Sequence, residues 1–117
     1  MTVLSIERER YVAALEQDLN ALVQQLSEMP TVQKVILFGS YATGRRDLFT
    51  DLDLLVVMYS SLDFVTRCAD MARRLHASVA LDVLVYTPQE IEQMQDRPFM
   101  RQVFKTGKVL YERKLPE

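Results

Sequence analysis

Two aspartates, Asp51 and Asp53, stand one residue apart just ahead of an apolar run that ends at Met58. Side chains alternate along a strand, so a strand through this run would direct both carboxylates to one face, with Cα atoms about 6.6 Å apart. Paired carboxylates repel each other and are costly to bury uncompensated, whereas Mg²⁺ is a hard cation that binds carboxylates, water and phosphates. The pair therefore predicts a magnesium site.

A glycine turn precedes the aspartates, with Gly39 twelve residues before Asp51. Gly39 can adopt dihedral angles closed to other residues and can approach a phosphate closely. Ser40 adds a hydroxyl and a backbone N–H at an expected helix start, where anions are favoured. The turn and the carboxylates together predict a metal-bound nucleoside triphosphate as the ligand.

The segments around these residues have the length and composition of strands. The apolar runs at 35–38 and 54–58 are rich in branched residues, which predicts a strand, a glycine turn, a short helix or loop, and a second strand. The sequence leaves open whether the second strand runs parallel or antiparallel to the first. A third strand is predicted over 78–86, with Asp82 among apolar neighbours.

Helices are predicted to flank these strands. The first is expected over 6–27, because apolar residues recur there at spacings of three and four: Val12, Leu15, Leu19, Leu22, Val23 and Leu26. Further helices are expected after Asp63, after Thr87 and over 98–106, and a short last strand over 109–111. These elements predict an α/β (α+β) fold, with a small sheet flanked by helices. We expect a single domain over 1–117, with the N-terminal helix at 6–27 and a catalytic core at 33–112.

The composition narrows the function classes. The 117 residues are 49% hydrophobic and carry a net charge of −2, from 14 basic and 16 acidic residues. No global positive field attracts nucleic acid, which argues against a polymerase-like role. Apolar runs fall far short of the roughly 18 residues of a membrane helix, and no signal peptide is visible, so we expect a soluble cytoplasmic protein. Cys68 is the only cysteine, which excludes an intrachain disulfide.

The Gly39-Ser40 turn, followed by Asp51-Leu52-Asp53 leading into a strand, resembles the signature of the nucleotidyltransferase superfamily related to DNA polymerase β. The short chain is similar to the minimal nucleotidyltransferases, abbreviated MNT, over most of residues 30–112. The resemblance implies a polymerase β-like fold, with a small mixed sheet flanked by helices. It also implies an Mg²⁺-dependent transfer of AMP, or another nucleotide, to a hydroxyl acceptor. Thr43 stands where minimal members often have Arg, and Thr50 where they often have Ser.

The resemblance also implies roles for named residues. Asp51 and Asp53 would hold two Mg²⁺ ions, one of them shared with Asp82, which would be the third acidic residue of the family's site. Asp82 would also accept the proton of the attacking hydroxyl. A structural ion pair within the core, or a position at the edge of the pleat, is the alternative for Asp82.

The phosphates have their own predicted partners. Gly39 and Ser40 would hold the distal phosphates of ATP. Thr50 keeps the hydroxyl of the usual Ser, whereas Thr43 removes a cation near the turn. Arg45 and Arg46 could supply that cation as phosphate contacts, or form a solvated loop pair.

The acceptor is the least constrained part of the hypothesis. Minimal family members are commonly paired with a HEPN-domain toxin, which the nucleotidyltransferase neutralises by adenylylation, so the resemblance implies an antitoxin with a HEPN partner. The sequence also leaves open whether the chain forms a homo-oligomer. One alternative is a non-catalytic binding module that neutralises a partner by occupancy, and another is an aminoglycoside-type small-molecule nucleotidyltransferase. An Mg²⁺-dependent nuclease or phosphohydrolase is a further alternative, which the Gly39-Ser40 turn disfavours.

Overall fold

Continuous apolar segments form the two central strands of a four-stranded sheet with helices on both faces. The computed structural model describes residues 2–114. Its elements run in chain order as α1 (Val3–Ser27), β1 (Val32–Phe38), α2 (Gly39–Ala42), β2 (Leu52–Met58), α3 (Phe64–Arg74), β3 (Leu81–Tyr86), α4 (Pro88–Met94), α5 (Pro98–Thr106) and β4 (Lys108–Glu112).

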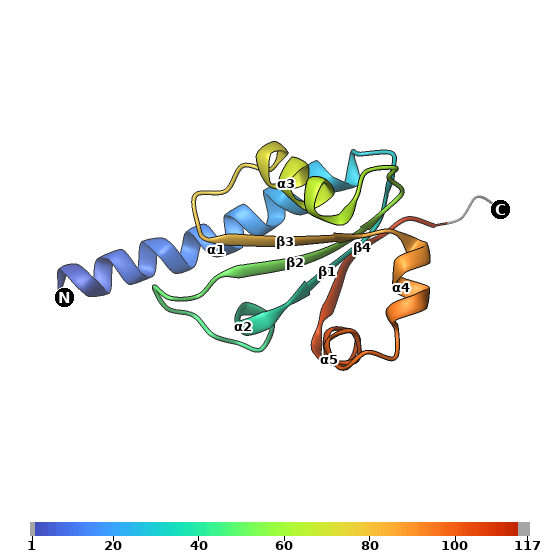
Figure 1. The fold of residues 1–117 in the computed structure, drawn as a ribbon. Helices are drawn as coiled ribbons and strands as arrows, with labels where there is room; N and C mark the ends of the chain where they lie inside the picture. The colour runs from blue at the N-terminus through green and yellow to red at the C-terminus, as the bar shows by residue number, and fades with distance from the viewer. Residues whose placement is uncertain (1, 115–117) are drawn as a thin grey trace.

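The sheet is mixed, as predicted. Its strand order is β3-β2-β1-β4 (Figure 1). Strand β1 pairs antiparallel with both β2 and β4, whereas β2 pairs parallel with β3. The connection between β1 and β2, whose direction the sequence left open, therefore returns the chain antiparallel. The β2–β3 pairing is in register, with Asp53 opposite Asp82.

Helices cover the sheet on two sides, with α1 and α3 on one face and α4 and α5 on the other (Figure 1). Alternate residues of the central strands point to opposite faces, and both faces are covered, so the runs 35–38 of β1 and 54–58 of β2 are apolar at every position. The α1 side buries mainly Leu15, Leu22, Leu26, Val35, Leu37, Leu52, Leu54, Val56, Met71 and Val85. The α5 side buries Ile36, Leu55, Val57, Tyr86, Met100 and Val103.

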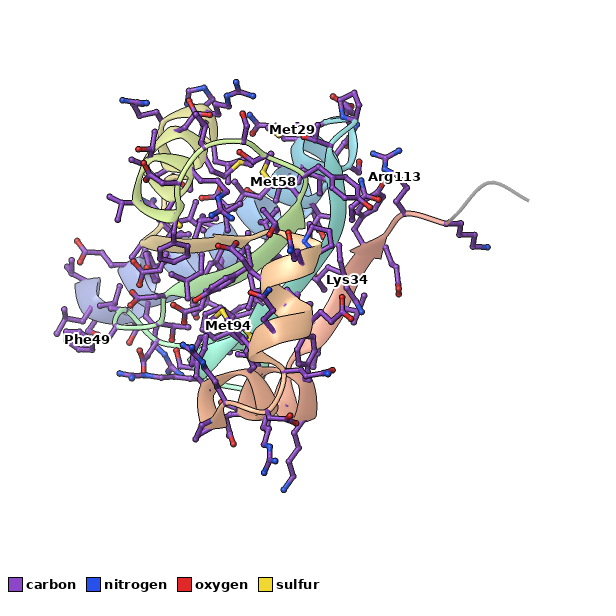
Figure 2. The ribbon with its side chains drawn as sticks, turned by 45° about the vertical axis from the view of Figure 1, so that its right-hand side comes forward. Met29, Lys34, Phe49, Met58, Met94 and Arg113 are labelled. Atoms are coloured by element: carbon purple, nitrogen blue, oxygen red, sulfur yellow. The ribbon has the colours of Figure 1, made fainter. Side chains whose placement is uncertain are left out.

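Helix α1 begins three residues earlier than the predicted start at residue 6 and ends at Ser27, as predicted. The early start has a local cause, because the Thr2 side chain accepts a hydrogen bond from the backbone N–H of Ser5 and so caps the helix. The first turns extend past the sheet edge (Figure 1). Phe49, which is 78% exposed, projects beside this end of α1 (Figure 2).

Strand β3 begins at Leu81 and not at residue 78, so the predicted start was wrong. The backbone N–H groups of Ser78 and Val79 donate to Asp18 Oδ2 on α1, at 2.6 and 3.1 Å. These donors are therefore held by a side chain on α1 and not by a neighbouring strand. The alternation of apolar residues alone could not reveal that Asp18 takes the place of a neighbouring strand as the acceptor.

The elements after α1 run from Val32 to Glu112, close to the predicted core at 33–112. That they form a single domain with α1 stays a prediction, and residues 1 and 115–117 of the predicted 1–117 lie outside the described residues. Over residues 2–114, no helix is both long enough and apolar enough to cross a membrane.

Candidate active site

Three strand ends meet at one edge of the sheet and carry the predicted aspartates. Strand β1 ends there, and the parallel strands β2 and β3 begin there. Asp53 and Asp82 are each the second residue of their strand, and the ladder places them opposite each other. Asp51 directly precedes β2. The structure therefore brings Asp53 and Asp82 side by side, with Asp51 next to them in the chain.

Partial burial and the two neighbouring carboxylates raise the pKa of Asp53. Its pKa is raised from 3.8 to about 6, chiefly because Asp53 is partly buried, then because of the negative charges of Asp82 and Asp51 and a hydrogen bond with Asp82. Asp82 itself is exposed, so it is not a charge paired within the core, whereas the alternative of a position at the edge of the pleat stays open. Asp53 is thus the inner carboxylate of the group and Asp82 the outer one.

Gly39 lies against Asp53 at the end of β1. Its φ of +78° is a conformation that residues with a Cβ rarely adopt, and a Cβ at this position would overlap Asp53 Oδ2. Glycine is therefore required twice here, by the backbone conformation and by the space that the carboxylate occupies. Phosphate binding by Gly39 and Ser40 stays a prediction.

The donor set at this edge suits a hard divalent cation. Within residues 2–114, no three His, Cys, Asp or Glu side chains are arranged as ligands of one ion. The three aspartates nevertheless supply only oxygen donors, the kind that Mg²⁺ prefers. Burial is the largest cause of the raised pKa of Asp53, and the negative charges of Asp82 and Asp51 add to it, a repulsion that a cation would offset. The residues present therefore fit magnesium.

The two predicted phosphate-binding arginines have different surroundings. Arg46 donates to the Tyr41 carbonyl at 2.8 Å, and its guanidinium stacks over the Tyr41 ring, 3.5 Å from the centroid. Arg45 is exposed, and its Nε donates to Asp47 Oδ2 at 2.9 Å. Arg46 is therefore held in the loop, and Arg45 is the more accessible cation.

The two threonines that depart from the family pattern also differ. Thr50 is fully buried, and its hydroxyl accepts from the Asp47 N–H at 2.9 Å, which closes the loop before β2. Thr43 is exposed and donates to the carbonyls of Gly39 and Ser40. Thr43 also lines a small cleft of about 180 Å³ between α2 and α5, together with Gly39 and Phe99.

Tyr11 also reaches this edge of the sheet, although no local spacing in the sequence predicts it. Its hydroxyl donates to the Thr50 carbonyl at 2.8 Å, directly before Asp51. The only signal in the sequence is a tyrosine beside the apolar stripe of a helix, which does not distinguish it from an ordinary packing residue.

Comparisons with known proteins show the family of this chain. Residues 20–115 match a family model described as polymerase beta, nucleotidyltransferase. A Methanocaldococcus jannaschii protein, provisionally named a protein adenylyltransferase, is 30% identical over 100 residues, covering 84% of this chain and 95% of that protein.

Two solved structures share the fold. One, from Sulfolobus solfataricus and provisionally assigned as a nucleotidyltransferase, aligns with a TM-score of 0.56 at 21% identity, over 97% of this chain and 91% of its own. The other, a toxin–antitoxin structure with AMP-PNP, aligns with a TM-score of 0.51 at 24% identity, over 85% of this chain and 74% of its own.

The packing of Gly39 against Asp53 predicts an unequal effect of two alanine substitutions. Gly44 has a φ of +110°, and a Cβ added there would meet nothing within 4 Å, so Gly44→Ala should cost only the backbone strain, about 1–2 kcal/mol. Gly39→Ala adds the collision with Asp53 and should lower the free energy of unfolding further. Urea unfolding of both variants measures the difference, and equal losses would contradict the packing argument.

The raised pKa of Asp53 predicts a pH dependence of stability in the metal-free protein. Between 3.8 and about 6 the folded protein binds more protons than the unfolded chain, so this group makes the free energy of unfolding fall as the pH rises. Asp53→Asn removes the titration, so the variant should be more stable than wild type above that window and lose the advantage below it. Urea unfolding in EDTA at about pH 4 and about pH 7.5 measures this.

Asp63→Asn provides a control of opposite sign. The pKa of Asp63 is lowered, chiefly by the hydrogen bond from the Thr66 N–H, so its contribution is present above the unfolded pKa and disappears as the pH falls. Its removal should therefore reduce stability at neutral pH relative to acidic pH. The same pH response in both variants would refute the assignment for Asp53.

Proposed function

The chain belongs to the polymerase β-type nucleotidyltransferase family, and from that premise we propose that it transfers AMP from ATP to a hydroxyl group of a partner protein. The observation that carries the proposal is the pairing of Asp53 and Asp82 across β2 and β3, with Gly39 packed against Asp53. The provisional name of the M. jannaschii relative, a protein adenylyltransferase, supports a protein as acceptor.

The proposed metal ligands are Asp51, Asp53 and Asp82, which would hold two Mg²⁺ ions. Bound there, the ions would neutralise negative charge on the α-phosphate and on the departing pyrophosphate. Asp82 and Asp51 contribute, after burial, to the raised pKa of Asp53, and this like-charge repulsion supports the assignment, because ligation would replace repulsion by attraction at the same atoms.

At the α-phosphorus the reaction makes one bond and breaks one. The acceptor hydroxyl oxygen attacks the α-phosphorus of ATP, the bond from that phosphorus to the oxygen between the α- and β-phosphates breaks, and pyrophosphate leaves. We assign the hydroxyl proton to Asp82, whose exposed side chain lies at the outer side of the carboxylate group, where an acceptor from solvent arrives. Positioning of the two reactants provides much of the acceleration.

The phosphates of ATP are proposed to bind beside α2. Gly39 and Ser40 offer backbone N–H groups at the start of this element, next to the carboxylates. Arg45 would contact a distal phosphate after its exposed ion pair with Asp47 opens. Opening this pair costs little, since exposed ion pairs contribute only about 0–1 kcal/mol to stability. Arg46 would instead hold the loop through its contacts with Tyr41.

For the acceptor we propose a HEPN-domain protein, which makes this chain the antitoxin of a toxin–antitoxin pair in the cytoplasm. The shared fold with a solved toxin–antitoxin structure that contains AMP-PNP supports the antitoxin role, and the HEPN domain of the partner is what the resemblance to minimal nucleotidyltransferases implies. The acceptor group would be a hydroxyl, most simply that of a tyrosine.

Metal-dependent binding of ATP is the first consequence. ATP should raise the melting temperature more with Mg²⁺ than with EDTA. At an ATP concentration of 100 times its Kd, binding adds about 2.7 kcal/mol to the free energy of unfolding. The Asp51→Asn, Asp53→Asn double variant should keep its circular dichroism spectrum and lose the Mg²⁺-dependent part of the shift. Equal shifts with Mg²⁺ and EDTA in the wild type would exclude the metal assignment.

Transfer to a protein is the second consequence. Co-expression with a HEPN-domain partner should increase the mass of that partner by one or more AMP units, and the double aspartate variant should abolish the increase. Intact-protein mass spectrometry measures the modification, and survival of the host cells measures neutralisation.

Two outcomes would redirect the proposal. If the folded double variant protects cells as well as wild type does, neutralisation occurs by occupancy and not by transfer. If wild type modifies only small molecules such as an aminoglycoside, the nucleotidyltransferase site stands and the protein acceptor is wrong.

A further inference from the structure

Helix α1 contacts the segments that directly precede β2 and β3, the two strands at whose start the proposed catalytic aspartates lie. The Tyr11 hydroxyl donates to the Thr50 carbonyl at 2.8 Å and accepts from the Ala80 N–H at 3.4 Å. Thr50 directly precedes Asp51, and Ala80 lies two residues before Asp82. One phenol oxygen therefore joins the segment that enters β2 to the segment that enters β3.

The contact lies just outside the first rung of the parallel ladder. The ladder begins with Leu52 opposite Leu81, and the Leu52 N–H donates to the Ala80 carbonyl at 2.9 Å. Both backbone polar groups of Ala80 are thus used, one by β2 and one by Tyr11. Asp51 precedes the ladder, so the Thr50 carbonyl is the nearest backbone group through which α1 holds it.

We infer that Tyr11 is a positioning residue for nucleotidyl transfer, whose hydroxyl fixes the spacing between the Asp51–Asp53 segment and Asp82. The inference rests on the proposed function, because it concerns the same three carboxylates. Tyr11 is 40 residues from Asp51 in the sequence, and its hydroxyl bonds to backbone groups beside the aspartates and not to their carboxylates. Its effect on the reaction is therefore indirect, through the backbone.

The surroundings of Tyr11 distinguish its hydroxyl from its ring. The ring packs against the buried cluster beneath α1, where it serves the fold. The hydroxyl serves two backbone groups, and one of them belongs to Thr50, which is fully buried. A buried carbonyl that loses its donor shifts toward another partner or toward water. The start of β2 should then move relative to β3.

Tyr11→Phe removes the hydroxyl and keeps the ring. We expect the variant to fold, to exchange the Ala80 amide proton at least about 10-fold faster, and to need about 10-fold more Mg²⁺ for ATP binding. For transfer we expect kcat to fall by about 10- to 100-fold, the size of effect that a misplacement of about 1 Å produces, with little change in the KM of the acceptor.

Two control variants separate positioning from general destabilisation. Tyr59→Phe removes the hydroxyl of a tyrosine that is 59% exposed on the surface, and should change none of these quantities. Asp18→Asn weakens the contacts to Ser78 and Val79, which hold the same connection before β3, but does not touch Thr50. At a matched loss of melting temperature, Asp18→Asn should reduce kcat less than Tyr11→Phe does.

A double variant tests whether the effect passes through Asp82. In an Asp82→Asn background, Tyr11→Phe should weaken Mg²⁺-dependent ATP binding by less than about twofold, because the carboxylate that it positions is gone. A kcat and Mg²⁺ requirement within about twofold of wild type in the Tyr11→Phe single variant would overturn the inference. Wild-type protein that binds ATP equally with Mg²⁺ and EDTA would instead overturn the proposed function, a failure visible without any variant.

Discussion

The in-register parallel pairing of β2 with β3 is the constraint on which the rest of the site depends. It places Asp53 directly opposite Asp82, two like charges at neighbouring positions, which is unfavourable without a cation. The pairing is maintained from the opposite face of the sheet, where Leu54 and Val85 are fully buried under α1 and α3. A register shift of one residue would move these apolar side chains out of the core and the carboxylate to the wrong face. The apolar packing therefore enforces an arrangement that electrostatics alone would oppose, which is how strained functional sites are generally maintained.

Helix α1 contributes to this arrangement in two separable ways. Its leucines, among them Leu15 and Leu22, bury an apolar stripe against the sheet and so fix the helix on that face. Polar side chains beside the stripe then hold loops, since Arg8 donates to the Arg46 carbonyl and Asp18 accepts from the α3–β3 connection. Tyr11 does both, with its ring in the core and its hydroxyl between two strand entrances. An element remote in sequence from every predicted site residue thus bears directly on how the site is positioned.

The sequence predicted the features that depend on local spacing. Alternation, apolar runs and helical spacing sufficed for strands that carry the aspartates and for a helix ending at Ser27, whereas the mixed character of the sheet came from the family resemblance. Features decided by contacts between distant segments were missed. The start of β3 depends on Asp18, which is 60 residues from Ser78, and the role of Tyr11 depends on partners 39 and 69 residues away. Gly39 shows the same limit, because its need for positive φ follows from the turn, whereas its contact with Asp53 follows only from the antiparallel return of β2.

The loop after α2 shows how the structure separates residues that the sequence treats as equivalent. Arg45 and Arg46 are adjacent cations. From the sequence, either could replace the arginine that minimal family members often have at the position of Thr43. Arg46 makes a hydrogen bond and a cation–π stack with Tyr41, a buried residue, so its withdrawal would disrupt packing as well as charge. Arg45 forms an exposed ion pair with Asp47, and Asp47 keeps its other contacts, with the Phe49 N–H and the Thr50 hydroxyl, when that pair opens. The cost of recruiting Arg45 to a phosphate is therefore small, since it exchanges one exposed anion for another of higher charge. A loop that holds one arginine tightly and leaves its neighbour accessible can keep its shape while it supplies a cation.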